Sequence, residues 1–307
     1  MPNDKLRSYL HFLVIVFIWG FTAVLGAFIS LNAGPLVWYR MLAASIFILL
    51  WKKWKGKKLR LAPKRVAAMI IAGLVIALHW LTFFGAIKVF NVSITLALMS
   101  TGAFFTSIME PIFYKRKVIW YEILFGIIVF LGLYIIFRVE TEHILGIVLA
   151  LISAFLSAVF SLINGKLSHH EDASVISFYE LLTGAAAISI YLLFLTFFGS
   201  SGDGFSAAFF DISASDIMYL LILASVCTAY DFIASVAVMR HLSPYTIMLT
   251  INLEPVYGIL LAFWIFGSEE KMNPGIYYGA AIILTTVILN GILKTKRKIK
   301  RQRKATF

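Results

Sequence analysis

Long apolar runs, separated by short polar segments, repeat along the whole chain. A helix that crosses a hydrocarbon core of about 30 Å needs about 20 residues. The runs predict about ten such helices, at residues 9–31, 36–51, 66–87, 93–114, 120–137, 144–165, 174–198, 216–238, 244–266 and 275–293. The second run is short for a span, and the first is too long for the core of a signal peptide. The sequence therefore predicts an all-α, polytopic membrane protein whose first span is retained.

The composition agrees with a protein that is solvated largely by lipid. Apolar residues make up 61% of the 307 residues and charged residues only 14%, with a mean hydropathy of +0.91. A soluble domain carries about 25% charged residues. The single cysteine, Cys227, lies within an apolar run, so we expect no disulfide within the chain and interpret it as a small buried hydrophobe.

The positive charges are distributed unevenly between the loops. If the N-terminus is inside, alternate loops and both chain ends hold 23 of the 27 Lys and Arg residues, and the other loops hold only Lys88, Arg138 and Lys271. Basic residues in short loops stay on the cytoplasmic side. We therefore expect an even number of spans, both termini in the cytoplasm, and a place in the cell (inner or plasma) membrane. The net charge of +12 lies in clusters beside spans, and no aromatic residues interleave the C-terminal cluster, so nucleic acid is not an expected partner.

Short matches at a steady offset indicate an internal repeat. The offset grows from 138 to 153 residues over four matches: residues 18–21 with 156–159, 39–42 with 179–182, 86–88 with 237–239, and 126–128 with 279–281. These matches predict two five-helix repeats, at residues 1–140 and 141–293, followed by a basic tail at 294–307. An odd number of spans in each repeat inverts the second copy in the membrane.

Further short motifs are spread over nearly the whole chain. They are Trp19-Gly20, Pro35 followed by Arg40, Ala86 to Lys88, Leu253 to Pro255, the turn Gly267 to Glu270, and Gly279. In combination they resemble the drug/metabolite transporter superfamily, EamA type. The resemblance implies two five-helix repeats with cytoplasmic termini, and secondary transport or facilitated export of a small polar metabolite such as an amino acid or a related compound. Members usually have a proline in the fourth span, where this chain has Ala103.

Six ionisable residues lie at the depth of the predicted spans. A charged side chain costs roughly 2.5–3.5 kcal/mol there, so it persists where it faces the bundle interior or a wet cavity. The six are Arg40, His79, Glu110, Glu180, Asp231 and Glu254. We predict that they contribute to a transport path, and each also has a structural interpretation.

Arg40 and Glu254 carry the most specific hypotheses. A guanidinium group keeps its proton, so Arg40 is predicted to clamp a substrate carboxylate, or else to pair with an acid or to reach the outer interface. Glu254 lies near the middle of the ninth span, where Pro255 frees a backbone carbonyl and lets a helix bend. Its carboxyl group could carry a proton, which makes protons the candidate coupling ion, or could be hydrogen-bonded to Asn252.

The remaining candidates are weaker. Glu180 is the repeat counterpart of Arg40, and it lies either at the opposite mouth of a path or at a wetted helix end. Asp231 and Glu110 are interpreted as gate or proton sites or as interhelical hydrogen bonds, and His79 as a proton relay or as packing. Four aromatic residues are expected either around a cavity or at the lipid interface: Trp19, Tyr39, Tyr179 and Tyr257.

Three classes of function fit these patterns, and a transporter of small solutes leads. The sequence has no phosphate-binding loop and no His-Glu-x-x-His motif, so neither ATP-driven transport nor a metal or other cofactor is expected, and the protein is not expected to be an enzyme. An intramembrane enzyme that uses buried Glu, Asp and His is one alternative, and a structural or signalling protein is the other. The polar run His169 to Asp172 is either a metal site or a solvated turn.

Overall fold

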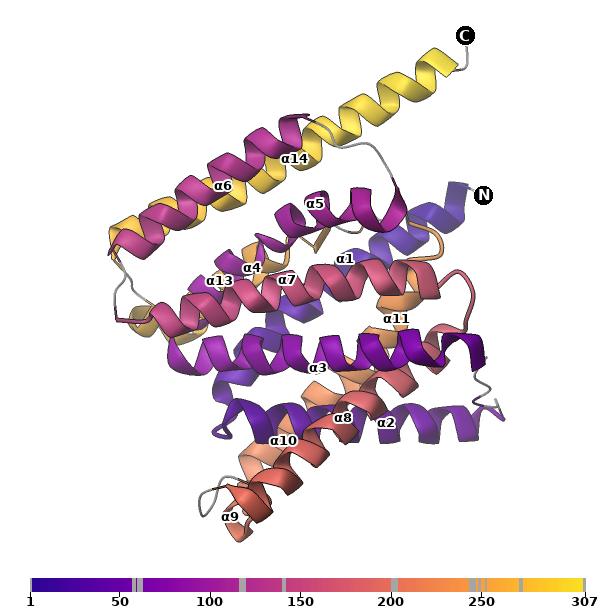
Figure 1. The fold of residues 1–307 in the computed structure, drawn as a ribbon, viewed down its shortest axis with the longest axis vertical. Coiled ribbons are helices and arrows are strands. Elements are labelled where there is room, and N and C mark those ends of the chain that lie inside the picture. The colour runs from indigo at the N-terminus through magenta and orange to yellow at the C-terminus, as the bar shows by residue number, and fades with distance from the viewer. Residues whose placement is uncertain are drawn as a thin grey trace.

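The protein is a bundle of long helices (Figure 1). The computed structural model describes residues 2–56, 59, 63–115, 120–139, 142–199, 204–242, 247, 250–251, 253–270 and 273–305, and every regular element in them is a helix. Seven helical segments are long and apolar enough to cross a membrane. Two shorter apolar helices, Leu124–Ile136 and Glu254–Phe266, accompany them.

The first half of the chain supplies the helices that begin the bundle. They are α1 (Pro2–Phe28), α2 (Ala33–Trp54), η1 (Pro63–Arg65), α3 (Val66–Val89), α4 (Val92–Met99), α5 (Gly102–Tyr114) and α6 (Trp120–Val139). The second predicted span is longer than its apolar run, because α2 continues for one turn beyond each end of that run. With 22 residues it has the length of a span.

The second half has a similar order of helices, with an additional π-helical turn between two of them. Its helices are α7 (Ile144–Leu167), α8 (Ala173–Phe198), α9 (Ala207–Phe210), α10 (Ala214–Ala224), the π-helical turn η2 (Ser225–Tyr230), α11 (Asp231–Val238), α13 (Glu254–Phe266), η3 (Gly267–Glu270) and α14 (Pro274–Ala305). The last helix continues as one rod through the basic segment that follows its apolar part.

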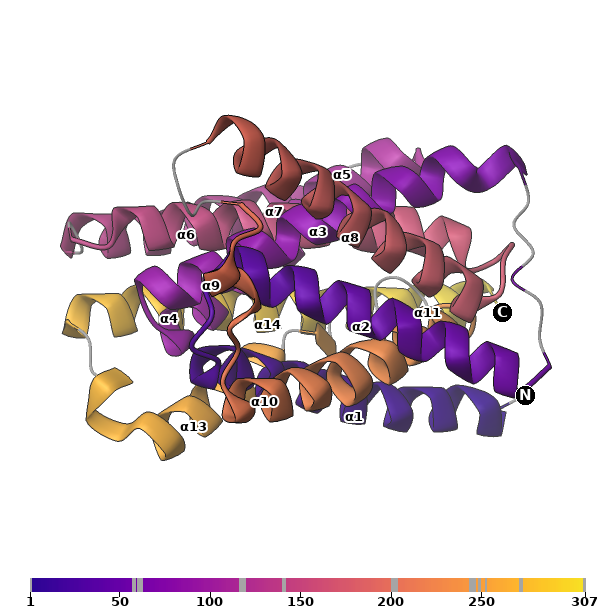
Figure 2. The ribbon, with the colours of Figure 1, turned by 90° about the horizontal axis from the view of Figure 1, so that it is seen from below.

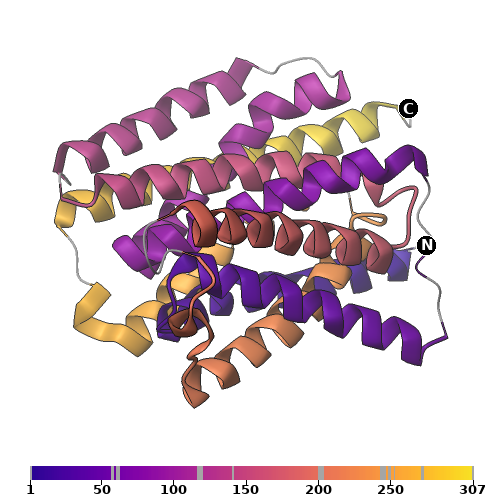
Figure 3. The ribbon, with the colours of Figure 1, turned by 60° about the horizontal axis from the view of Figure 1, so that its bottom comes forward.

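Helices from the two halves pack against each other throughout. In the middle of the bundle α3 contacts α7 and α8, α2 contacts α8, and α1 and α4 both contact α13. At one edge α6 and α14 lie side by side (Figure 1). The N-terminus, the C-terminus and the α7–α8 connection lie at the same end of the bundle (Figures 2 and 3).

Two predicted spans are interrupted where the sequence suggested continuous helices. The fourth span breaks at Ser100 and Thr101, whose hydroxyl groups bond the carbonyl oxygens of Ala97 and Leu98. This break needs no proline, because such side-chain bonds compete with the helical ladder. In the ninth span Pro255 does not bend a continuous helix; it lies in the first turn of α13, where a missing N–H costs nothing.

Candidate functional site: a charged cavity between the two halves

A cavity of about 90 Å³ lies inside the bundle, with room for several water molecules. Side chains from both halves line it. Five of the residues predicted from the sequence are among them: Trp19 from α1, Arg40 from α2, His79 from α3, Asp231 from α11 and Glu254 from α13. The other lining groups are mostly aromatic rings and hydroxyl groups, including Trp80, Phe83, Phe160, Phe232, Thr22, Ser157 and Ser161.

Arg40 is only 2% exposed, and it is held by the π-helical turn of the opposite half. Its Nε donates to Thr228 Oγ1 at 2.6 Å, and its Nη2 donates to the carbonyl oxygen of Cys227 at 3.1 Å. A π turn is wider than an α turn and often marks a functional site. Thr228 Oγ1 also donates to the carbonyl oxygen of Leu223, five residues earlier, so this hydroxyl group links the widened turn to Arg40.

The guanidinium group also lies on an aromatic face. Its Cζ is 3.8 Å from the centroid of the Trp80 ring and 5.4 Å from that of Phe84. A cation over an aromatic ring is stabilised by about 0.5–2 kcal/mol, and more when water is excluded. The third guanidinium nitrogen, Nη1, has no hydrogen-bond partner within the described residues. One nitrogen of this cation is therefore buried without a partner in a residue that lines the cavity.

Asp231 brings negative charge to the same cavity. It is the first residue of α11, directly after the π turn, and it is 1% exposed. Neither of its carboxyl oxygens has a hydrogen-bond partner within the described residues, although the indole of Trp19 lies beside them without reaching hydrogen-bond geometry. A buried carboxyl group without partners is costly, so this position favours a ligand, water or a proton.

Glu254 adds a second carboxyl group. It begins α13, directly after the interruption of the ninth span, and lines the cavity. Arg40 interacts electrostatically with both Asp231 and Glu254, yet no ion pair joins them within the part of the chain that the structure describes. The cation and the two acids therefore line one cavity within range of each other's charge. Asn252, the expected alternative partner of Glu254, lies outside the described residues.

His79 is fixed by the neighbouring helix α7. Its Nδ1 lies 2.8 Å from Ser153 Oγ and 3.0 Å from the carbonyl oxygen of Ser153. A carbonyl oxygen only accepts, so a proton on Nδ1 satisfies this contact and leaves Nε2 as an acceptor. His79 therefore joins the two halves and presents a polar ring to the cavity.

The structure places the other predicted residues elsewhere. Glu180 is fully buried, so it is not a wetted helix end, and its Oε2 accepts from Asn164 Nδ2 at 3.2 Å. Glu110 on α5 is not among the residues that line the cavity. The three tyrosines pack against other helices: Tyr39 donates to the carbonyl oxygen of Phe209 and stacks on its ring, and Tyr179 and Tyr257 pack against hydrophobic clusters.

Sequence analysis missed the residues that hold the charges in place. Trp80 and Thr228 support Arg40, and Ser153 supports His79. An intramembrane arginine requires acceptors, and hydroxyl residues near Asp231 were a usable signal for them. No pattern in the sequence indicates which helix faces Arg40, because that depends on how the halves pack.

An all-helical bundle with membrane-length helices and a charged internal cavity defines a membrane transport protein as the class to test. The family model described as "EamA-like transporter family" matches this chain twice, over residues 6–138 and 144–292. The chain therefore belongs to the EamA-like transporter family, and it is an integral membrane protein. Members of this family are transporters of small solutes and not enzymes.

Solved structures support the fold. A chain titled "Crystal structure of protein" matches with a TM-score of 0.64 and 13% sequence identity, covering 94% of this chain and 98% of its own length. Such a low identity supports the fold and says nothing of the solute. No curated protein matches the sequence.

Proposed function

We propose that this protein moves a small polar metabolite with both an anionic and a cationic group, such as an amino acid or a related compound, across the cell membrane. The observation that carries the proposal is one cavity lined by Arg40, whose Nη1 has no partner within the described residues, by the unpartnered carboxyl group of Asp231 and by Glu254. Arg40 would bind a carboxylate, and the acids would bind an ammonium group. We propose export as the direction of transport.

The surroundings of these charges suit such a solute. Each charge of a zwitterion would meet an opposite charge in a small cavity inside the bundle, where electrostatic interactions are stronger than in bulk water. Aromatic rings around the charges, among them Trp19, Phe160 and Phe232, would cover the apolar part of the solute. Hydroxyl groups from Ser157 and Ser161 would contribute adaptable hydrogen bonds.

The acids also provide a route for proton coupling. When the ammonium group of a solute leaves Asp231 and Glu254, two carboxyl groups share a cavity with one guanidinium group. A proton on one of them balances that charge. His79, whose ring lies in the same cavity, is suited to relay it.

We further propose ten spans in two inverted repeats, residues 1–140 and 141–293, with a cytoplasmic tail at 294–307. The packing supports this arrangement, because several contact pairs have a counterpart after exchange of the halves: α3 with α8 corresponds to α2 with α10, and α3 with α7 to α1 with α11. The helices after the two interruptions begin at Gly102 and Glu254, 152 residues apart, and Gly126 and Gly279 lie 153 residues apart. Alternating access would follow from rocking of the halves about the cavity.

Counterflow in proteoliposomes tests the proposal. Reconstituted protein should exchange a labelled amino acid against internal unlabelled amino acid, and Glu254→Gln should reduce this flux by about tenfold or more, because hydrogen bonds to charged groups contribute roughly 1.5–3 kcal/mol. The exposed acid Asp211 lies outside the cavity, so Asp211→Asn is the matched control. Unchanged flux in a folded Glu254→Gln protein would remove Glu254 from the mechanism.

The role of Arg40 has a separate test in the same vesicles. Arg40→Gln should weaken the apparent affinity for the amino acid by about tenfold or more, and should affect the corresponding amino acid amide less, because the amide has no carboxylate to lose. Equal losses for both solutes would contradict a carboxylate clamp. Absence of counterflow for every zwitterion, with flux for solutes of a single charge, would overturn the proposed substrate class.

A further inference from the structure

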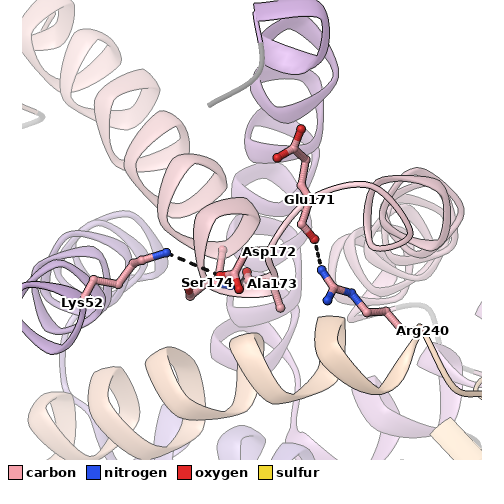
Figure 4. A network of polar contacts seen from close by, with 7 residues as sticks. Lys52, Glu171, Asp172, Ala173, Ser174 and Arg240 are labelled. Carbon is pink, nitrogen blue, oxygen red and sulfur yellow. Dashed lines mark hydrogen bonds and ion pairs between the residues drawn. The ribbon is translucent and has the colours of Figure 1, made fainter. Parts of the chain in front are cut away.

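The short connection between α7 and α8, residues 168–172, is tied to three other parts of the chain by cations. Lys52 comes from the end of α2, Arg65 from η1 and Arg240 from the segment after α11. Figure 4 shows Lys52 and Arg240 approaching this connection from opposite sides. We refer to residues 168–172 as the hub loop.

Two of these cations come from the first half of the chain. Lys52 is 3% exposed, and its Nζ lies 3.5 Å from Asp172 Oδ1. Arg65 Nη1 lies 2.5 Å from Glu171 Oε1 and 3.2 Å from the carbonyl oxygen of His170. The hub loop belongs to the second half, so these contacts join the two halves at the end of the bundle where both termini lie (Figures 2 and 3).

The third cation comes from the second half and holds the loop backbone. Arg240 Nε donates to the carbonyl oxygen of Ser168 at 2.7 Å, and its Nη2 donates to the carbonyl oxygen of Glu171. Because Arg240 belongs to the same half as the hub loop, its bonds need not break when the halves separate. The bonds of Lys52 and Arg65 must break.

A second, smaller cavity lies between the hub loop and the charged cavity. It has a volume of about 20 Å³, and its lining includes residues of the charged cavity and of the hub loop. Ser161 and Met239 line the charged cavity as well, and His169 belongs to the hub loop. The second cavity therefore lies beside the charged cavity, on the side of the hub loop.

We propose that the hub loop is a gate of the transport path, closed by Lys52 and Arg65. It lies at the end of the bundle that holds both chain termini, which we call the terminal face. This inference rests on the proposed function, because a gate requires a path. Release of Glu171 from Arg65 and of Asp172 from Lys52 would let the loop move away with Arg240. The small cavity beside His169 would then open to solvent at this face.

The opposite end of the bundle carries its own contacts between the halves. Asp216 at the start of α10 accepts from Ser30 N at 2.8 Å and from Ser30 Oγ at 2.5 Å. Lys88 donates to the carbonyl oxygen of Ile29 next to this contact. Both ends are therefore bridged in this structure, and weakening the Asp216 contact provides a control at the far face.

The natural sequence contains a reporter for opening. Cys227 is the single cysteine of the chain, it lines the charged cavity and it is 2% exposed. A membrane-impermeant methanethiosulfonate reagent, added at the terminal face of sealed vesicles of known orientation, would reach Cys227 only through an opened hub loop. Cys227→Ser gives the background of the labelling.

The test variant combines Glu171→Gln with Asp172→Asn. It removes both negative charges, and the side-chain oxygen of asparagine can still cap α8. We expect Cys227 to be labelled about threefold to tenfold faster from the terminal face, as two partly exposed ion pairs imply. Arg65→Gln, which changes a different element, should produce a smaller increase in the same direction. Chromatography and thermal unfolding in detergent identify any variant that has not folded.

Two controls separate gating from loosening of the whole bundle. Lys53→Gln removes an exposed cation next to Lys52 that makes no ion pair within the described residues, and it should leave labelling unchanged. Asp216→Asn, at the opposite face, should not accelerate labelling from the terminal face. Equal acceleration by either control, or no acceleration in the folded double variant, would overturn the gate.

Labelling of Cys227 tests the gate, and counterflow tests the proposed function, so one proposal can fail while the other holds. Faster labelling without flux of any zwitterion would support the gate and overturn the proposed substrate class. Counterflow in the wild type, with labelling that does not respond to the double variant, would support transport and overturn the gate.

Discussion

Arg40 illustrates how single residues make a charged cavity possible in this fold. Its guanidinium group is buried at a depth where a cation is expensive, and three supports come from two other elements: a hydroxyl group, a backbone carbonyl and an indole face. The support uses neutral groups, so the cation keeps its charge available. No ion pair joins Arg40 to Asp231 or Glu254 within the described residues, so in the proposed function a solute can pair with each of them.

Thr228→Val tests this support. Valine has nearly the shape of threonine but lacks the oxygen that accepts from Arg40 Nε, which leaves a buried donor unsatisfied. We expect a loss of about 1–3 kcal/mol in the free energy of unfolding, seen as a lower unfolding temperature in detergent. Ser225→Ala removes a more exposed hydroxyl group from the same turn and should have little effect. Similar losses in both variants would show that the turn, and not Arg40, is the cause.

Asp172 should give stability a dependence on pH. Burial alone would raise the pKa of its carboxyl group, but hydrogen bonds from Ser174 and the charge of Lys52 outweigh burial and lower the pKa below its ordinary value of 3.8. The charged form therefore stabilises the folded protein above that ordinary value, and this contribution disappears as the pH falls through the lower pKa of the folded protein.

Asp172→Asn removes this dependence. The variant should unfold at a lower temperature than the wild type near neutral pH, and the difference should narrow as the pH falls below the pKa of the folded protein. Thermal unfolding in detergent over a pH series measures it. A difference that stays constant with pH would mean that the carboxylate charge contributes nothing.

At the scale of elements, interruptions in helices place the functional groups. The π turn directs Thr228 and Cys227 toward Arg40, and the break before α13 puts Glu254 at a helix start beside the cavity. Freed backbone at membrane depth is tolerated where it lines a cavity or is covered by protein. The interruptions therefore place groups beside the cavity, and the cavity makes the freed backbone tolerable at this depth.

Close contact between α3 and α8 depends on one glycine. A Cβ added to Gly73 would lie 2.6 Å from the carbonyl oxygen of Glu180 and 2.8 Å from Cβ of Thr183. Gly73→Ala should cost about 1–3 kcal/mol because the helices must move apart. Gly34→Ala, in the first turn of α2, meets nothing within 4 Å and should be neutral or slightly stabilising. Unfolding temperatures of the two variants make the comparison, and equal values would contradict the close contact.

At the scale of the whole molecule, the two halves share nearly every layer of the bundle. The pairs α6 with α14, α2 with α8 and α4 with α13 each join corresponding elements of the two halves. Neither half buries its apolar surface alone, so the cavity between them exists only in the assembled chain. This dependence fits the proposal that the halves rock about the cavity.

The paired halves predict one result that involves no solute. Accessible tags at the two ends of the chain should be modified from the same side of the membrane, the cytoplasmic side, because 23 of the 27 basic residues lie in the predicted inner segments. Protease protection in oriented vesicles measures this. Tags found on opposite sides would imply an odd number of spans and would contradict inverted repeats.

Much of the architecture was predictable because apolar periodicity is a local property. The runs around α3, α7 and α8 gave spans within one or two residues of the observed helices. The sequence analysis placed a basic tail at 294–307 and did not predict that α14 continues through it to Ala305, and serine and threonine at 100 and 101 did not predict a break. Those outcomes depend on side-chain bonds and neighbours that a hydropathy pattern does not contain.

Candidate site residues were found because a charge in an apolar run is conspicuous. Arg40, His79, Asp231 and Glu254 do line one cavity, whereas Glu180 is buried with Asn164 away from it. All five stood out in the sequence for the same reason, an ionisable side chain at the depth of a predicted span. Only the packing of the helices separates them.

The amino-acid sequence by itself determined that this chain is a helical membrane protein with cations concentrated in alternate loops, because lipid solvation and helix length act on local runs of residues. The tertiary structure decided which charges share a cavity, which neutral groups hold Arg40 and how the hub loop joins the halves. These features depend on contacts between residues far apart in the chain, and a contact of that kind exists only once the helices have packed.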